Sequence, residues 1–140
     1  MEEGISRTRL RGAGPDRFNS LRRQLGVSSF GINEIVLQPR QRGRIHLHTR
    51  QEEVFLVLEG VLTIGIEGEE ERLEEGELIR VAPGIRRQLV NEGPGVLVLL
   101  ALGGDGEHVG RDGEAFTGWD DHERGRAPQE IPLPEDLPAD

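Results

Sequence analysis

Short apolar runs, separated by clusters of Gly and Pro, occupy the middle of the 140-residue chain. None of the gaps between the runs is long enough for the crossover helix that parallel strands need. The strands must therefore be antiparallel, and the pattern predicts an all-β sandwich or barrel. The predicted strands cover residues 30–37, 44–48, 53–58, 61–66, 78–81, 87–91 and 96–102.

One short helix is predicted before the strands. Phe18, Leu21 and Leu25 recur at helical spacing, so they can form one apolar stripe. Asp16 is the expected N-terminal cap of this helix, and Gly26 is expected to end it.

The chain divides into three zones that together form one domain. Residues 1–28 are a polar and basic extension with the short helix, and residues 29–103 form the barrel. Residues 104–140 are acidic and rich in Gly and Pro, so we expect an irregular tail that packs on the barrel.

Charge is unevenly distributed along the chain. Residues 1–50 contain ten arginines and four acidic residues, whereas residues 51–140 contain seven arginines and 22 acidic residues. An arginine-rich stretch can contact nucleic acid, but no recognition helix or aromatic platform accompanies it, and the formal net charge is -9. We therefore expect no nucleic-acid partner. The basic stretch then pairs with the chain's own acidic part or with that of a second subunit.

Two predicted strands, with the sequences VFLVL and VLVLLAL, are apolar on both faces. In a small barrel one face fills the interior, and the other must be covered by a second sheet, the termini or another subunit. Together with the charge distribution, this pattern predicts a homodimer.

The chain has no cysteine, no apolar run of about 18 residues and no start of signal-peptide type. These features favour a cytoplasmic protein with no membrane partner. They also exclude a disulfide framework and thiolate chemistry.

The segment RIHLHTRQEEVFLVLEG carries the chemistry. His46 and His48 are two residues apart on a predicted strand, so both imidazoles point to the same face. After a turn, Glu53 and Phe55 share a face of the next strand, whereas alternation places Glu52 on the opposite face. Two imidazoles and a carboxylate that converge can bind a divalent transition metal (Fe, Mn, Ni, Zn or Cu) and leave coordination positions open.

This stretch resembles the first motif of the cupin family. In that motif a His-x-His pair is followed by Glu after three or four residues and then by Gly six residues later. The spacing is satisfied by His46, His48, Glu53 and Gly60. The leading Gly of the motif is replaced by Arg40 here.

A second motif of the same family is similar to the segment GELIRVAPGIRRQLVN, which runs from Gly76 through Gly84 to Asn91. The family's Pro is replaced by Ala82, and Asn91 is expected to close a turn by bonding to the backbone. The resemblance covers about residues 30–102. It implies a jelly-roll barrel, often dimeric, with a pocket metal bound by three His and one Glu. The activities of the cupin family range from dioxygenases and isomerases to metal-free sugar binding, so the fold alone does not define the reaction.

The family's third histidine ligand falls on Arg87. A guanidinium stays protonated and has no lone pair to donate, so an inward Arg87 weakens cation binding. The metal can be kept by His46, His48 and Glu53, with Arg87 binding an anionic substrate or pairing with Glu53. Alternatively, the pocket is metal-free and Arg87 receives a carboxylate or phosphate directly. In a third arrangement the motif is vestigial, and Arg87 and Glu53 form a buried ion pair.

The sequence therefore predicts a small cupin that binds a divalent metal and a small anionic or oxygen-rich molecule, as a metal-dependent oxygenase or isomerase. The alternative is a non-catalytic, metal-free cupin that binds a small molecule through Arg87 as an anion receptor. The candidate substrate-binding residues are Arg87, Arg40, Gln38 and Phe55.

Overall fold

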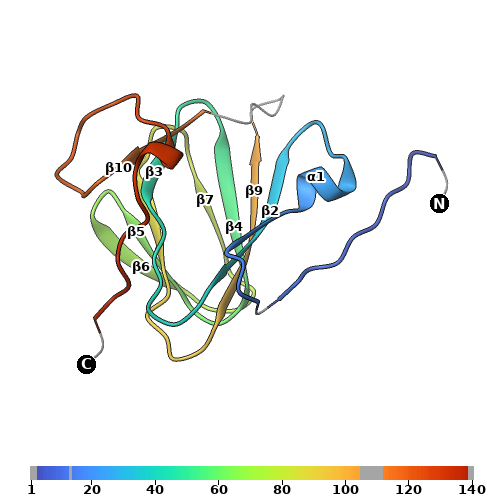
Figure 1. Ribbon diagram of the computed structural model, residues 1–140, viewed down its shortest axis with the longest axis horizontal. Helices are drawn as coiled ribbons and strands as arrows, with labels where there is room; N and C mark the ends of the chain where they lie inside the picture. The colour runs from blue at the N-terminus through green and yellow to red at the C-terminus, as the bar shows by residue number, and fades with distance from the viewer. Residues whose placement is uncertain (1–2, 13, 105–111, 139–140) are drawn as a thin grey trace.

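The computed structural model describes residues 3–12, 14–104 and 112–138. Within these ranges, two antiparallel five-stranded sheets face each other as a jelly-roll barrel, in the orders β1-β2-β9-β4-β7 and β10-β3-β8-β5-β6 (Figure 1). The elements are β1 (Phe18–Ser20), α1 (Leu21–Leu25), β2 (Gly31–Leu37), β3 (Ile45–His48), β4 (Glu52–Glu59), β5 (Leu62–Ile66), β6 (Glu69–Leu73), β7 (Leu78–Val81), β8 (Arg87–Val90), β9 (Leu97–Gly104), β10 (Gly113–Phe116) and the 3-10 helix η1 (Pro128–Glu130). The prediction of an all-β antiparallel jelly roll is confirmed.

The space between the sheets is filled by alternate side chains of the strands. On β4, Phe55 and Val57 are each 1% exposed, and on β9, Leu97 and Leu99 are fully buried. They belong to one apolar cluster that includes residues of both sheets. Removing this apolar surface from water is the main force that holds the sheets together. The interior is therefore apolar along most of its length, and a cluster of His46, His48 and Glu53 lies at one end.

The helix α1 begins later than the sequence predicts. Ser20, not Asp16, caps it, because the Ser20 Oγ accepts a hydrogen bond of 3.3 Å from the Arg23 N–H. Gly26 ends the helix as predicted, in a left-handed conformation with φ 74°. The helix cannot start at Asp16, because β1 pairs with β2 and keeps the chain extended. Within the described ranges, no helix is long and apolar enough to span a membrane.

Two motif residues hold turns at the end of the barrel away from the histidines. Gly60 has a φ of 87°, and a Cβ at this position would lie 2.4 Å from the Val96 carbonyl oxygen. The side chain of Asn91 donates hydrogen bonds of 2.9 Å to the carbonyls of Leu37 and Gly95. The prediction that Asn91 closes a turn is confirmed.

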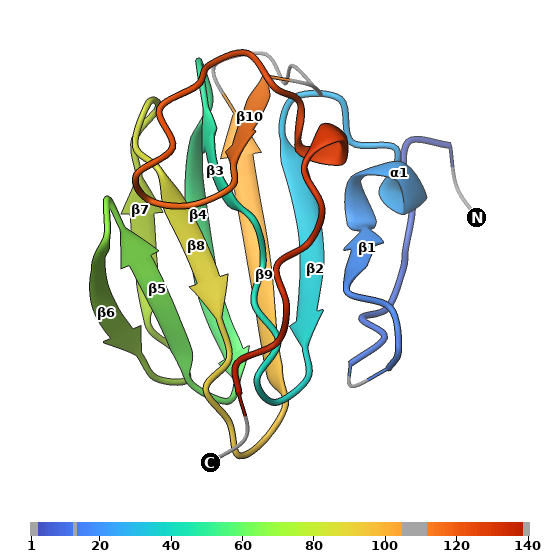
Figure 2. The ribbon, with the colours of Figure 1, turned by 60° about the vertical axis from the view of Figure 1, so that its left-hand side comes forward.

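The C-terminal segment is more regular than the sequence predicts. Its strand β10 pairs with β3, and Gly113 lies opposite His48 while Ala115 lies opposite His46. After β10 the chain crosses the outer face of this sheet (Figure 2). There Trp119 packs against the apolar cluster of Ile45, Leu47 and Phe116. The sequence also did not predict β1 and β6, which are short or highly charged. The tail thus adds an edge strand beside the two histidines.

Candidate metal centre

Three side chains converge at the polar end of the barrel interior. The Nε2 atoms of His46 and His48, on β3, lie 3.9 and 3.7 Å from the Oε1 atom of Glu53, on β4. One ligand atom from each residue lies within 4.8 Å of the other two. The three side chains are 15% to 23% exposed, so the cluster is mostly enclosed but reachable from solvent. Strand alternation therefore brings together the three residues that the sequence selects.

Hydrogen bonds on the other ring nitrogen orient both histidines. The Nδ1 atom of His46 lies 3.1 Å from the Arg44 carbonyl oxygen. The Nδ1 atom of His48 lies 2.8 Å from the Asp112 carboxylate. Both acceptors favour a proton on Nδ1, which leaves the Nε2 lone pairs directed at the cluster. A carboxylate behind a histidine in this way is typical of metal sites.

Asp112 is a site residue that the sequence reasoning missed. It accepts hydrogen bonds from the backbone N–H groups of Arg50 and Gln51, at 3.0 and 2.9 Å. Burial raises the pKa of Asp112, but the hydrogen bonds from His48 and from this backbone outweigh burial and hold the pKa below its usual range. No local signal could reveal Asp112, because it reaches His48 through the pairing of β10 with β3, 64 residues along the chain.

Glu53 carries an unsatisfied buried oxygen. Its Oε1 atom has no hydrogen-bond partner within the part of the chain that the structure describes. Burial raises the pKa of Glu53, but the adjacent His46 and His48 lower it further, so that the group is ionised. In return, burial lowers the pKa of His48, but Glu53 and Asp112 raise it by more. An ionised oxygen without a partner is costly to bury, and a cation between it and the two Nε2 atoms would remove that cost.

Arg87 lies directly behind this cluster. It faces His46 across the β3–β8 pair, and its side chain is fully buried. Its Nε atom lies 3.7 Å from the Glu53 Oε1 atom, too far for a hydrogen bond, and its Nη1 atom donates to the Ile85 carbonyl oxygen at 3.0 Å. Burial lowers the pKa of Arg87, while Glu53 and Asp112 raise it, and a guanidinium remains charged under these conditions. This positive charge repels a cation bound at the cluster, and Arg87 supplies no ligand atom to the cation.

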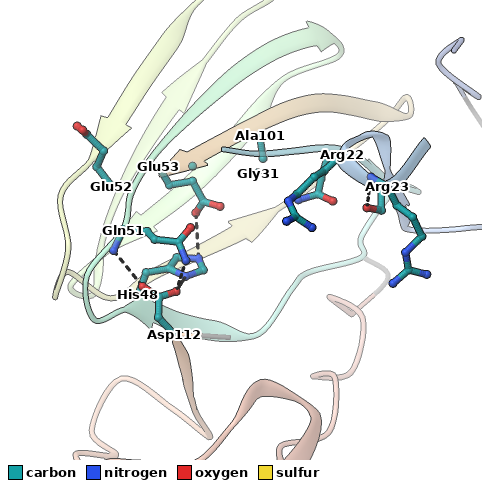
Figure 3. Close-up of a pocket in the computed structure, with 12 residues that line it drawn as sticks. Arg22, Arg23, Gly31, His48, Gln51, Glu52, Glu53, Ala101 and Asp112 are labelled. Atoms are coloured by element: carbon teal, nitrogen blue, oxygen red, sulfur yellow. Dashed lines mark hydrogen bonds and ion pairs between the residues drawn. The ribbon is translucent and has the colours of Figure 1, made fainter. Parts of the chain in front are cut away.

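A cavity of about 390 Å³ opens beside the cluster. His48, Glu53 and Asp112 line one side of it, and Arg22 and Arg23 of α1 line the other (Figure 3). The two arginines were not predicted as site residues, since nothing in the sequence indicates that α1, which packs beside β2, reaches this cavity. Arg87 does not line the cavity and is not accessible to a ligand in this arrangement.

Three other predicted substrate-binding residues lie away from the cavity, which corrects the sequence interpretation. Gln38 and Arg40 follow β2 at the opposite end of the barrel, where their side chains donate hydrogen bonds to the carbonyls of Gly14 and Pro138, at 3.1 and 2.9 Å. Their nearness to the histidines in sequence is misleading, because the chain crosses the barrel between them. Phe55 faces inward as predicted but is 1% exposed and belongs to the apolar core.

Comparison with known proteins agrees with this architecture. The cupin domain profile matches residues 33–103, and the chain belongs to the cupin family. The chain is 32% identical over 69 residues to the tetracenomycin polyketide synthase protein TcmJ of Streptomyces glaucescens, which covers 49% of this chain and 46% of that protein. This chain therefore spans about half the length of that curated relative.

Two solved structures illustrate the likeness of fold. A putative sugar phosphate isomerase from Acidithiobacillus ferrooxidans is 25% identical, with a TM-score of 0.61 over 70% of this chain and 63% of that one. A cupin protein from Bacteroides fragilis is 19% identical, with a TM-score of 0.66 over 88% of this chain and 99% of that one. The second likeness shows the fold alone.

Proposed function

We propose that the protein binds one divalent transition metal through His46, His48 and Glu53 and presents it to a small anionic, oxygen-rich molecule in the adjoining cavity. One observation carries this proposal. The buried Oε1 atom of Glu53 has no hydrogen-bond partner among the described residues, and two oriented Nε2 atoms lie 3.7 and 3.9 Å from it. These distances are longer than hydrogen bonds, and they suit three ligand atoms that surround one metal ion.

The donor set fits Fe, Mn, Ni, Zn or Cu, because imidazole and carboxylate are ligands that these metals share. When bound, the metal would supply a Lewis acid that polarises a carbonyl or hydroxyl oxygen of the ligand. The protein's own residues perform the remaining tasks. Asp112 fixes the ring of His48, the apolar core beneath the site excludes water, and the cavity admits the ligand from the side of α1.

Of the two reaction classes that the sequence allows, isomerisation is the better supported. The likeness to a putative sugar phosphate isomerase favours a phosphorylated, oxygen-rich substrate, and the arginine-lined wall of the cavity suits its charge. The metal-free alternative with Arg87 as the anion receptor is less well supported, because Arg87 is fully buried behind Glu53.

Metal analysis tests this proposal directly. Protein purified without an affinity tag is dialysed with Mn, Ni or Zn, and the amount of metal bound per protein chain is then measured by mass spectrometry. The parent should retain about one equivalent, and the Glu53→Gln and His48→Ala variants should retain far less. His122→Ala is the matched control, because His122 is exposed and outside the cluster. A parent that retains no metal would show that the proposal is wrong.

We also propose that the protein is a homodimer, as the sequence predicts. Val54 pairs with Leu102 and Leu56 with Leu100, and by alternation these four side chains point away from the core. All four are partly exposed, and Leu78 on the neighbouring strand is 62% exposed. A second copy would cover this apolar face. Light scattering at micromolar concentration and moderate salt should give the mass of a dimer, and a Leu56→Glu variant should give a monomer. A monomeric parent would contradict the proposal.

A further inference from the structure

The cavity beside the metal cluster has a cationic wall that the metal site does not use. Arg22 and Arg23 are consecutive residues of α1, and both line the cavity. In Figure 3 the side chain of Arg22 points back toward Glu53 and His48, whereas that of Arg23 extends away from them. Arg22 is therefore the guanidinium of α1 that faces the cluster across the cavity.

Arg22 has hydrogen-bonding capacity to spare. Its Nε atom is buried and makes no hydrogen bond with any described residue. The helix that carries it is fixed at both ends, by the Ser20 cap and by Gly26, so the side chain starts from a defined position. A partly buried guanidinium without a partner is unfavourable unless an anion satisfies it.

Three carboxylates line the same cavity; Glu53 belongs to the metal cluster, and the other two are hydrogen-bonded elsewhere. Glu52 accepts a hydrogen bond of 2.5 Å from the Nε atom of Arg80, outside the cavity. Asp112 accepts hydrogen bonds from His48 and from the backbone of the 50–51 turn. Among the residues that the structure describes, none of these groups pairs with Arg22, so its charge is available to a ligand.

We propose that Arg22 binds the phosphate group of a phosphorylated small molecule in this cavity. The fork of a guanidinium donates two parallel hydrogen bonds to an oxyanion, and Arg23 next to it adds a second positive charge for a phosphate monoester. The rest of the ligand then extends toward His48 and Glu53, at the opposite side of the cavity. This orientation rests on the proposed function, whereas phosphate binding by Arg22 needs no metal.

Calorimetric titration with inorganic phosphate tests the inference on protein stripped of metal. The parent should bind phosphate, and Arg22→Gln should weaken the affinity by about tenfold or more, the effect of one lost charge-assisted pair. Arg9→Gln is the matched control, because it removes the same charge from an exposed position outside the cavity. It should bind phosphate like the parent. Equal affinity of Arg22→Gln and the parent, or no phosphate binding by the parent at millimolar concentration, would overturn the inference.

A parallel metal titration separates this inference from the proposed function. Arg22→Gln should bind metal at least as well as the parent, because Arg22 is no ligand. Loss of phosphate binding with unchanged metal binding supports both proposals. If the protein binds no metal but its phosphate binding depends on Arg22, the inference about Arg22 is supported and the proposed metal site is wrong. If the protein binds metal but Arg22→Gln binds phosphate like the parent, the proposed metal site is supported and the inference about Arg22 is wrong.

Discussion

Two Arg–Glu pairs of this molecule have opposite geometry. On the tail, Glu114 accepts hydrogen bonds of 2.7 and 2.9 Å from the Nε and Nη2 atoms of Arg124, and a third of 2.8 Å from the Gly125 N–H. Inside the barrel, the Nε atom of Arg87 lies 3.7 Å from the Oε1 atom of Glu53 and forms no hydrogen bond with it. The outer pair uses the fork of the guanidinium, and the inner pair does not.

The difference in hydrogen bonding between the two pairs indicates that the inner pair is not arranged for stability. Stability favours the outer geometry, since a buried charge pair offsets its desolvation only when its hydrogen bonds are made. Inside the barrel, the Glu53 oxygen lies 3.7 to 3.9 Å from His46, His48 and Arg87 alike and is bonded to none of them. Such an arrangement leaves the Glu53 oxygen able to bind a metal ion, and it lowers the stability of the metal-free fold.

The largest expected effect comes from removing one member of the inner pair. In metal-free protein, Glu53→Gln leaves the buried Arg87 without its counter-charge, so the free energy of unfolding should fall by about 3 kcal/mol. Glu114→Gln, at the outer pair, should cost about 1 kcal/mol. Urea denaturation of the two variants and the parent measures both values. Equal losses would mean that the inner pair behaves as a surface pair.

A double variant sharpens this result. Glu53→Gln combined with Arg87→Met removes both charges and replaces the guanidinium with an apolar side chain of similar length. It should recover most of the stability lost by Glu53→Gln alone. If the double variant is as unstable as the single one, the loss comes from packing and not from an unpaired charge.

Metal affinity should respond strongly to Arg87→His. Arg87 lies opposite His46 on the neighbouring strand, so an imidazole at position 87 would enter the cluster as a further ligand. The change also removes a buried positive charge, and we expect the affinity for Zn or Ni to rise on the order of a hundredfold. Calorimetric titration of the variant against the parent measures the change. Unchanged affinity would mean that position 87 does not reach the metal.

A smaller effect is expected from Asp112→Asn. The amide can still contact His48 but no longer carries the charge that favours a proton on Nδ1, so the orientation of the ring is less well defined. Metal affinity should fall about tenfold. The matched control is Asp136→Asn, because Asp136 lies in the C-terminal tail, outside the cavity lining. A fall of the same size in the control would assign the effect to net charge.

The sequence predicted the central strands and the ligand cluster because both depend on local spacing, but it did not predict β1, β6 and β10. Strand alternation puts His46 and His48 on one face, and the resemblance to the cupin family indicates that this face, like the face that carries Arg87, points inward. The residues that complete the site come from distant segments. Arg22 reaches the cavity through the docking of α1, and Asp112 is brought there by the β10–β3 pairing.

Errors of the sequence interpretation have the same origin. Gln38 and Arg40 are close to His46 in sequence, but the chain between them runs from one end of the barrel to the other. Asp16 is a good helix cap by residue type, but β1 pairs with β2 and moves the start of α1 to Leu21. In each case the three-dimensional path of the chain decided the outcome, and the type and spacing of neighbouring residues do not encode it.

The smallest expected effect is the pH dependence of the outer pair. Hydrogen bonding from Arg124 lowers the pKa of Glu114 from 4.5 to about 2, with burial opposing it and the Gly125 N–H adding to it. A lowered folded-state pKa means that the pair stabilises the fold fully above about pH 4.5 and loses this contribution as the pH falls toward 2. The contribution stays small because Arg124 is exposed and screened by solvent. The difference in urea midpoint between the parent and Glu114→Gln should therefore be constant from pH 7 to pH 5.5 and should shrink at pH 3. A difference that persists unchanged at pH 3 would mean that Glu114 contributes through packing and neutral hydrogen bonds, and the contrast with the inner pair would then rest on burial alone.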